Sequence, residues 1–546
     1  MKKIKYIFLL LFINLIEIQS QVVYLHTSHE VYNYLKRLES TQIITGFRDA
    51  VKPLSRKEIA KFIFNASQNQ HLLTDVDKEN IKFYLEEFYA ELPIEAKNDT
   101  TLFERWNVVN YESGDANVKV NFVGGYSVHR WGDGKTTRTR LNGLTTYGYL
   151  GKRVGAYLYF RDHQEGGNWL DSKKDLRNEQ GQITVRATSQ NIEYDFADAQ
   201  LNFDFDNFVF SIEKMNNVWG AGENGNLILS TKSPSYPQIK LKIELGKKAT
   251  FTYVHAFLHS ELIDSVNSYI TQYGIDSKIY RPIYRNKFLA SHILEFSPID
   301  GIDIALGESN VYGNRSPELI FLIPVMFFKA AEHYTVDLDN NQLFGTYDIN
   351  YFKNYNFYGT LFIDEFSTDE FLREDRQRNQ IGYTLGSRIY DLGFENSRLI
   401  FEFTRVNPWA YNHKYPDATY QSHNVDLGHW IGQNAQNIFI KYTFQPKRNL
   451  QVSALFDQLE KGGKLPNTEQ YKLPTPKFLY GPKIFRRSFG LEAKYELFRD
   501  IFLNSHILIE SYNQEENIQN VFQYTRRSEN YSNKLDVLFG LYYNIQ

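Results

Sequence analysis

From residue 117 onward the chain alternates apolar and polar side chains with a period of two, and this pattern constrains the fold more than any other feature. Residues 239–245 read Ile-Lys-Leu-Lys-Ile-Glu-Leu, and residues 489–496 and 535–545 alternate in the same way. Successive side chains of a strand point to opposite faces, so these segments predict strands with one apolar face. A soluble sandwich also alternates. Strands of about 9–13 residues, with an aromatic-rich last strand, instead favour a β-barrel that crosses an outer membrane.

About eighteen strands are expected, an even number as bacterial single-chain barrels require. They begin near residues 117, 136, 152, 192, 205, 236, 248, 284, 300, 344, 355, 379, 396, 436, 449, 487, 500 and 533. Within them Leu241, Leu491 and Phe539 should face lipid. Their neighbours Lys242, Glu492 and Gly540 should face the lumen.

Short and long connections between these strands alternate almost throughout. Tight turns are expected at Gly151, Asp206, Gly246, Asp300, Lys353, Lys447 and Asp500. Long loops are expected at 164–191, 216–235, 259–283, 311–343, 367–378, 408–435, 460–486 and 512–532. Outer-membrane barrels have short periplasmic turns and long extracellular loops, so both termini should lie in the periplasm. The first hairpin, at residues 132–135, is the exception because its short turn should face outward.

Composition agrees with a secreted barrel. The 546 residues include 39 Tyr and 41 Phe, yet the mean hydropathy is −0.46, as expected when apolar and polar residues alternate. Residues 1–20 combine Lys2, Lys3 and Lys5 with a short apolar run and predict a signal peptide. Without cysteine, neither disulfides nor a lipid anchor on a processed cysteine is expected. A net charge of −3 gives no electrostatic case for nucleic acid.

Residues 21–96 predict a small α-helical module on the periplasmic side, followed by a polar linker at 97–116. Capping boxes are expected at Thr27–Glu30 and Ser55–Glu58, and a third helix around residues 81–88. A different segment, 317–330, is apolar and interrupted by proline in the middle of a long loop. Because it should avoid water, we expect it to fold into the barrel mouth.

Motifs for catalysis or cofactors are weak. Residues 220–225 match the dinucleotide fingerprint letter for letter, but extended chain and prolines follow where a helix is required, so a tight loop is the better interpretation. A calcium site at Asp337, Asp339 and Asn340 is disfavoured against a solvated loop. No serine elbow or zinc-protease motif occurs, so we predict no enzyme, no cofactor and no metal.

The loop at residues 407–434 is the best candidate site. It interleaves aromatic side chains with amides and acids, a combination that suits the apolar faces and hydroxyl rims of sugars. These aromatics could instead pack the loop onto the barrel rim. The candidate glycan-binding residues are Trp409, Tyr411, His413, Tyr420, His429 and Trp430, with Trp219 as the next candidate.

Three segments resemble the Wzi-type capsule assembly proteins. They are Trp219–Gly222 with the run to Leu241, the apolar segment 317–330, and Tyr411–His413 through Tyr420 to Gly432. Ala221 stands where the family has proline. The resemblance implies an eighteen-stranded outer-membrane barrel with a periplasmic helical bundle, acting as a lectin that holds capsular polysaccharide. Residues 30–63 more weakly resemble one surface-layer-homology repeat, which implies binding of a cell-wall polymer.

The sequence therefore predicts a non-enzymatic outer-membrane protein that binds surface polysaccharide and assists capsule assembly or attachment. Its expected partners are capsular or other surface polysaccharide, outer-membrane lipids, the barrel assembly machinery and, through the helical module, a cell-wall polymer. Two alternatives remain open. If its lumen is open, a barrel of this size is a porin or a substrate-specific channel. The other alternative is an outer-membrane enzyme.

Overall fold

The computed structural model describes residues 22–170, 178–273, 277–335, 338–368, 379–464, 466–515 and 530–545. The predicted signal peptide at 1–20 lies outside this part of the chain. Within the described residues, no helix combines the length and apolar character needed to cross a bilayer.

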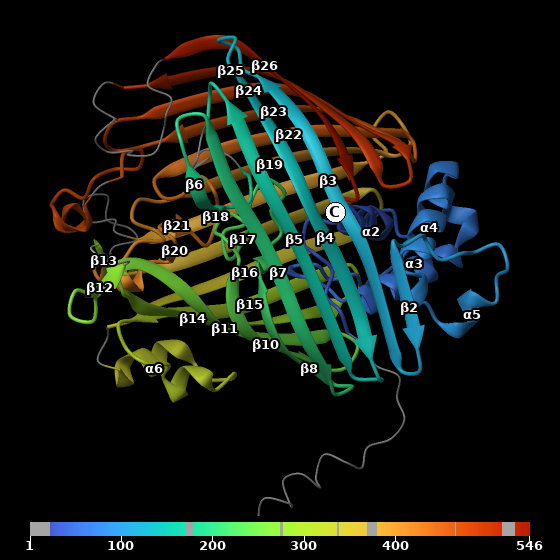
Figure 1. The fold of residues 1–546 in the computed structure, drawn as a ribbon, viewed down its shortest axis with the longest axis horizontal. Coiled ribbons are helices and arrows are strands. Elements are labelled where there is room, and N and C mark those ends of the chain that lie inside the picture. Colours follow the sequence, from blue (N-terminus) through green and yellow to red (C-terminus); the bar gives the residue numbers. More distant parts are fainter. Residues whose placement is uncertain are drawn as a thin grey trace, which may run out of the picture.

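Eighteen antiparallel strands form a closed barrel in sequence order, and β26 pairs with β3 to close it (Figure 1). The strands are β3 (Ala116–Arg130), β4 (Thr136–Leu150), β5 (Val154–Gly167), β7 (Asn191–Asp204), β8 (Phe208–Met215), β10 (Tyr236–Glu244), β11 (Ala249–Ile263), β14 (Tyr284–Ile299), β15 (Ile302–Gly313), β16 (Asn340–Phe352), β17 (Tyr355–Glu365), β18 (Gln380–Tyr390), β19 (Ser397–Val406), β22 (Ala435–Lys447), β23 (Leu450–Lys461), β24 (Ile484–Phe498), β25 (Ile501–Gln514) and β26 (Tyr531–Tyr543). Each begins within four residues of its predicted start. Two extra strands, β2 (Val109–Ser113) and β6 (Ile183–Ala187), pair with β3 and β7. The polar linker predicted at 97–116 thus contains a strand.

The two faces of the strands agree with the predicted alternation. Leu491 and Phe539 point outward with 60% and 55% of their surface exposed. Lys242 points inward and pairs with Glu58 of the helical module at 3.1 Å, and Glu492 pairs with Lys441 at 2.6 Å. At these positions the outer face is apolar and the inner face is charged.

Connections divide the barrel into two ends. At one end, which we call the turn end, short connections join the strands at 151–153, 205–207, 245–248, 300–301, 353–354, 391–396, 448–449 and 499–500. The other, the loop end, carries the long connections and the short first hairpin at 131–135. The predicted alternation of connection lengths is confirmed.

A helical module precedes the barrel. It contains α2 (Val31–Ser40), α3 (Arg56–Ser67), α4 (Asp75–Glu87) and α5 (Ile94–Lys97). Ser55 caps α3 by accepting the Glu58 N–H at 3.1 Å, which is one half of the predicted box, and the Glu58 carboxylate pairs with Lys242 instead. The capping box predicted at Thr27–Glu30 is wrong, because Glu30 is itself the N-cap and the His29 ring nitrogen accepts the Val31 N–H. A box between Thr74 and Asp77 caps α4 instead.

The module docks against the turn end of the barrel. Arg37 of α2 donates to Asp391 in a tight turn at 2.7 Å. Arg105, which follows the module, donates to Glu87 of α4 at 2.6 Å and to Asp500 in another tight turn at 2.7 Å. Deeper inside, the Arg56 guanidinium lies 4.1 Å from the ring centroid of Tyr147 on β4. These are buried, charge-assisted contacts, so the module is a fixed part of the barrel.

The apolar segment at 317–330 does not enter the barrel mouth, and that prediction is wrong. It forms η3 (Leu319–Leu322) and the start of α6 (Phe328–Tyr334), which lies outside the barrel wall (Figure 1). Phe321 and Phe328 are buried against outward-facing side chains of β11, β14 and β15. There the wall carries the polar pair His292 and Glu308, 3.1 Å apart, and the Phe328 N–H donates to Glu308 at 2.9 Å. Covering this pair shields it from lipid.

Candidate functional site

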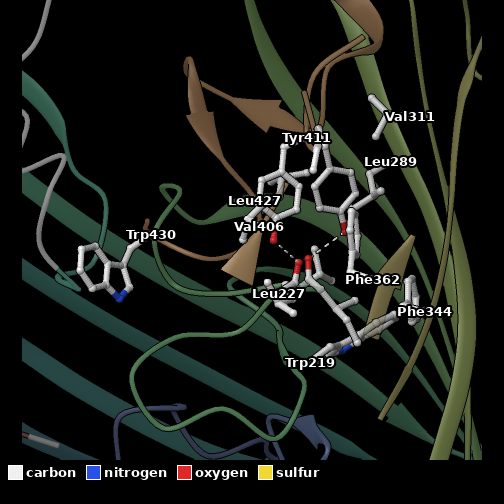
Figure 2. Packing of buried hydrophobic residues seen from close by; sticks show 14 of the residues in the cluster. Trp219, Leu227, Leu289, Val311, Phe344, Phe362, Val406, Tyr411, Leu427 and Trp430 are labelled. Carbon is white, nitrogen blue, oxygen red and sulfur yellow. Dashed lines mark hydrogen bonds between the residues drawn. The ribbon is translucent and has the colours of Figure 1, made fainter. Parts of the chain in front are cut away.

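Two loops from the loop end fold down into the lumen and share one apolar core. Residues 216–235 supply Trp219 and Leu227–Leu229, all fully buried. The loop at 407–434 supplies Tyr411 and Tyr420. Figure 2 shows Trp219, Leu227 and Tyr411 near Phe344 and Phe362 of the inner wall, and all of them belong to one buried cluster. The lumen at this level is therefore filled by protein.

Hydrogen bonds lock the two loops together. The Tyr411 hydroxyl donates to the Leu227 carbonyl at 2.8 Å, and the Tyr420 hydroxyl donates to the Ile228 carbonyl at 2.9 Å. The two tyrosine rings stack at 5.7 Å. Since the buried hydroxyls are satisfied, these tyrosines stabilise the loop pair.

The loop core meets the helical module inside the barrel. Strand β1 (Val51–Lys52) of the module pairs with β9 (Val218–Trp219) of the loop, in the register Val51↔Trp219. The Gly220 N–H also donates to the Ala50 carbonyl at 2.8 Å. We call residues 216–235 and 407–434 together with the module the plug, since they join across the lumen.

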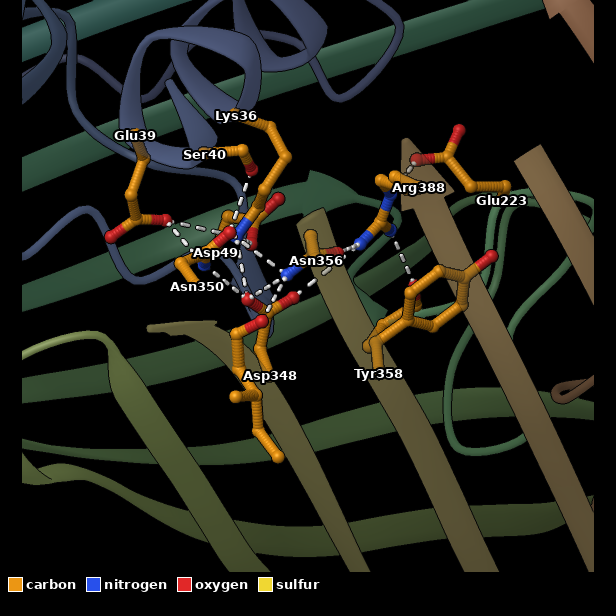
Figure 3. Close-up of polar contacts among 12 residues, drawn as sticks. Lys36, Glu39, Ser40, Asp49, Glu223, Asp348, Asn350, Asn356, Tyr358 and Arg388 are labelled. Carbon is orange, nitrogen blue, oxygen red and sulfur yellow. Dashed lines mark hydrogen bonds and ion pairs between the residues drawn. The ribbon is translucent and has the colours of Figure 1, made fainter. Parts of the chain in front are cut away.

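A polar network ties the plug to the barrel wall (Figure 3). Arg388 of β18 donates to Glu223 at 2.5 Å and to the Ala221 carbonyl at 2.7 Å, and its guanidinium lies 3.8 Å from the ring centroid of Tyr358. On the module side, Lys36 lies 2.8 Å from Asp49 and 3.3 Å from Asp348 of β16. Each buried charge thus faces an opposite charge.

The glycine-rich segment at 220–225 forms the tight loop that was predicted. The backbone N–H groups of Glu223 and Asn224 donate to the Glu402 carboxylate at 2.6 and 3.0 Å. A bound phosphate would need such N–H groups. Here Glu402 occupies them, so they serve the fold of the plug.

Most of the predicted glycan-binding residues lie together, but in the interior. Trp219, Trp409, Tyr411, Tyr420, His429 and Trp430 are each at most 5% exposed. Burial lowers the pKa of His429 to about 3, so it is neutral at physiological pH. His413 stands apart, half-buried at the surface with its ring 5.3 Å from that of Tyr415. The buried rings shape the loop from inside, and His413 is the one that solvent reaches.

A surface groove of about 860 Å³ lies at the loop end of the outer wall, and the sequence reasoning missed it. Tyr126, Arg140 and Gln164 are cross-strand neighbours on β3, β4 and β5 and line it side by side. Arg138 lies two residues along β4 from Arg140, on the same face, and Asn168, Gln190 and Asn191 contribute further polar groups to the lining. Arg138 and Arg140 occupy two successive outward positions of β4, where a lipid-facing belt requires apolar residues. This pair of arginines could have indicated the groove from the sequence.

The closed barrel, its apolar belt and its internal plug define an outer-membrane β-barrel protein. Residues 131–526 match the family described as Capsule assembly protein Wzi, which is most of the chain. The chain therefore belongs to the Wzi capsule assembly family, and the resemblance seen in the sequence is confirmed.

Solved structures of similar fold include Wzi of Escherichia coli, described as an outer membrane protein involved in group 1 capsule assembly and a carbohydrate-binding β-barrel. It is 13% identical with a TM-score of 0.55, and the match covers 96% of this chain and 100% of that one. OprD of Pseudomonas aeruginosa is 10% identical with a TM-score of 0.41, over 78% and 94% of the two chains. OccAB4 of Acinetobacter baumannii is 9% identical with a TM-score of 0.42, over 79% and 98%. No curated protein matches the chain.

Proposed function

We propose that this protein binds surface polysaccharide and assists capsule assembly or attachment without catalysing a reaction. The observation that carries the proposal is the plug, which joins the loops and the helical module through β1 and β9 inside the barrel. A filled lumen makes the barrel a scaffold that presents its loop end. Membership of the Wzi family supports the same function.

The two rival functions fit the plug less well. A porin needs a continuous aqueous lumen, whereas apolar side chains of both loops pack against the inner wall here. An enzyme needs reactive groups that substrate can reach. The carboxylates of Glu223 and Glu402 are instead engaged inside the plug by Arg388 and by backbone N–H groups.

We assign the polysaccharide contacts to the groove at the loop end. Tyr126 is 50% exposed and offers an aromatic face for the apolar side of a sugar ring. Arg138 and Arg140 are exposed and would pair with carboxylate or other acidic groups of a polymer. The amides of Gln164, Gln190 and Asn191 suit hydroxyls. His413 and Tyr415 on the loop at 407–434 offer a second exposed contact.

The combined variant Tyr126→Ala, Arg138→Gln, Arg140→Gln should shed polysaccharide into the medium while keeping a folded, heat-modifiable barrel. Loss of one stacking ring and two charge-assisted contacts should weaken binding roughly 100-fold, at about 1 kcal/mol per contact. The measurement is cell-associated against released polysaccharide. The control carries Lys247→Gln, Lys353→Gln and Tyr355→Ala at the turn end, which are exposed residues of matched chemistry. Equal retention by the two variants would contradict the assignment to the groove.

We also propose that the turn end, the helical module and both termini face the periplasm. Single cysteines at Ile270 or Tyr471, which are 66% and 57% exposed at the loop end, should be labelled on intact cells. Cysteines at Gly246, Asp300 or Lys447 should be labelled only after the outer membrane is opened. The natural chain has no cysteine, so a thiol reagent should label only the introduced residue in this protein. Labelling of the tight turns on intact cells would reverse the orientation.

Binding of a cell-wall polymer by the helical module stays a prediction. Arg48 and Asp49 lie within residues 30–63, which resemble a surface-layer-homology repeat, and both are engaged within the protein. Arg48 donates to Thr250 of β11 at 3.1 Å, and Asp49 pairs with Lys36. Arg48 thus docks the module onto the barrel, and Asp49 holds Lys36 within the module.

A further inference from the structure

Two histidines and a glutamate converge at the rim of the loop end. His259 and Glu261 lie near the end of β11, and His423 lies in the turn between β20 (Gln421–Ser422) and β21 (Val425–Asp426). One carboxylate oxygen of Glu261 is 3.3 Å from Nδ1 of His259 and 3.1 Å from Nδ1 of His423. The imidazole rings stack in parallel with centroids 4.3 Å apart. The three side chains are a quarter to a third exposed, so ions reach them from solvent.

The backbone holds these residues in unusual conformations. Glu261 and His423 have φ angles of 55° and 53°, a left-handed region that residues with side chains rarely adopt. The pairing of β11 with β14 shifts register between His259 and Ile263. The His423 N–H donates to the His259 carbonyl at 3.0 Å, which fixes the loop tip against the strand. Such strained positions often mark functional sites.

We propose that His259, Glu261 and His423 bind a divalent transition-metal ion of the zinc class. Three donor atoms around a tetrahedral ion with bonds of about 2.0–2.1 Å lie about 3.4 Å apart, close to the two separations observed. Two imidazoles and one carboxylate suit zinc, whereas calcium and magnesium prefer oxygen ligands throughout. The candidate ligand atoms of all three side chains lie within 4.8 Å of one another. The fourth position stays open to water or to an oxygen of a sugar.

The ion would act as a clamp between the barrel wall and the loop at 407–434. His259 and Glu261 belong to the wall, and His423 belongs to the loop, so coordination ties the loop tip to the rim. This inference stands on the cluster alone and does not depend on polysaccharide binding.

The test uses the untagged full-length barrel in detergent, stripped with a chelator, and titrated with zinc chloride by calorimetry at about pH 7.5, where histidine is mostly neutral. One equivalent should bind. His259→Ala, Glu261→Gln and His423→Ala should each weaken binding by about 100-fold or more, since even second-shell changes cost 10–100-fold. His71→Ala is the matched control, an exposed histidine in the helical module, and should bind like the parent.

A second readout separates loss of the site from misfolding. Cobalt should give the intense visible absorption of a tetrahedral ion in the parent and in His71→Ala. The three site variants should lose this absorption while keeping the heat-modifiable mobility of a folded barrel. Absence of zinc binding by the parent would overturn the proposal. So would zinc binding that survives in both histidine variants.

Discussion

Trp219→Ala is expected to destabilise the plug by about 3–5 kcal/mol, the usual cost of removing a large buried aromatic side chain. Trp219 is 0% exposed, and its ring centroid lies 6.3 Å from that of Phe344 on the barrel wall. It is also the residue of β9 that pairs with Val51 of the module. The cavity left by the indole therefore lies where the loops and the module join.

Loosening this junction should open the lumen to ions. We expect the parent to stay closed in planar bilayers and Trp219→Ala to conduct, with faster hydrogen exchange of the amides at 219–230. Trp106→Ala makes the same substitution at a 67% exposed position and should change stability by no more than about 0.5 kcal/mol. A steady large conductance from the parent would instead support a porin. A Trp219→Ala variant as closed and stable as Trp106→Ala would show that the plug does not depend on this contact.

Arg388→Ala should cost about 3–5 kcal/mol in the free energy of unfolding, because it leaves buried acidic groups without their counter-charge. The guanidinium contacts Glu223, the Ala221 carbonyl and Asp348, so it joins the loop at 216–235 to the barrel wall. Arg388→Lys keeps the charge but not the planar fork, and we expect an intermediate loss. Urea unfolding after refolding into lipid vesicles measures each variant.

A double variant distinguishes the charge of Arg388 from its packing. Adding Glu223→Gln to Arg388→Ala removes the orphaned carboxylate and should recover part of the stability. Glu223→Gln alone should be destabilising, since it weakens the pair that it leaves behind. Additive losses in the double variant would mean that Arg388 acts through its volume and its stacking on Tyr358, not through charge.

The residue types of the loop at 407–434 do not distinguish a sugar-binding site from a buried core. Trp409, Tyr420 and Trp430 beside amides suggest a sugar site, but each is at most 5% exposed. Tyrosine and tryptophan combine an apolar ring with one hydrogen-bonding group. They therefore suit a buried core as well as a sugar-binding site. A variant lacking all three would lose much of the plug core, so polysaccharide release from it would not identify contacts. The exposed groove allows the cleaner experiment.

The sequence by itself determined the barrel: eighteen strands, their starts, the outward positions of Leu491 and Phe539, and the two kinds of connection. These follow because lipid on one face and a polar interior on the other impose a local rule on every second residue. Only the tertiary structure decided where the loops go. The apolar residues of 317–330 and the aromatic residues of 407–434 each need a contact surface, but the sequence does not say which surface that is. The first segment covers His292 and Glu308 on the outer wall and the second fills the lumen, since each choice depends on side chains brought together from distant strands.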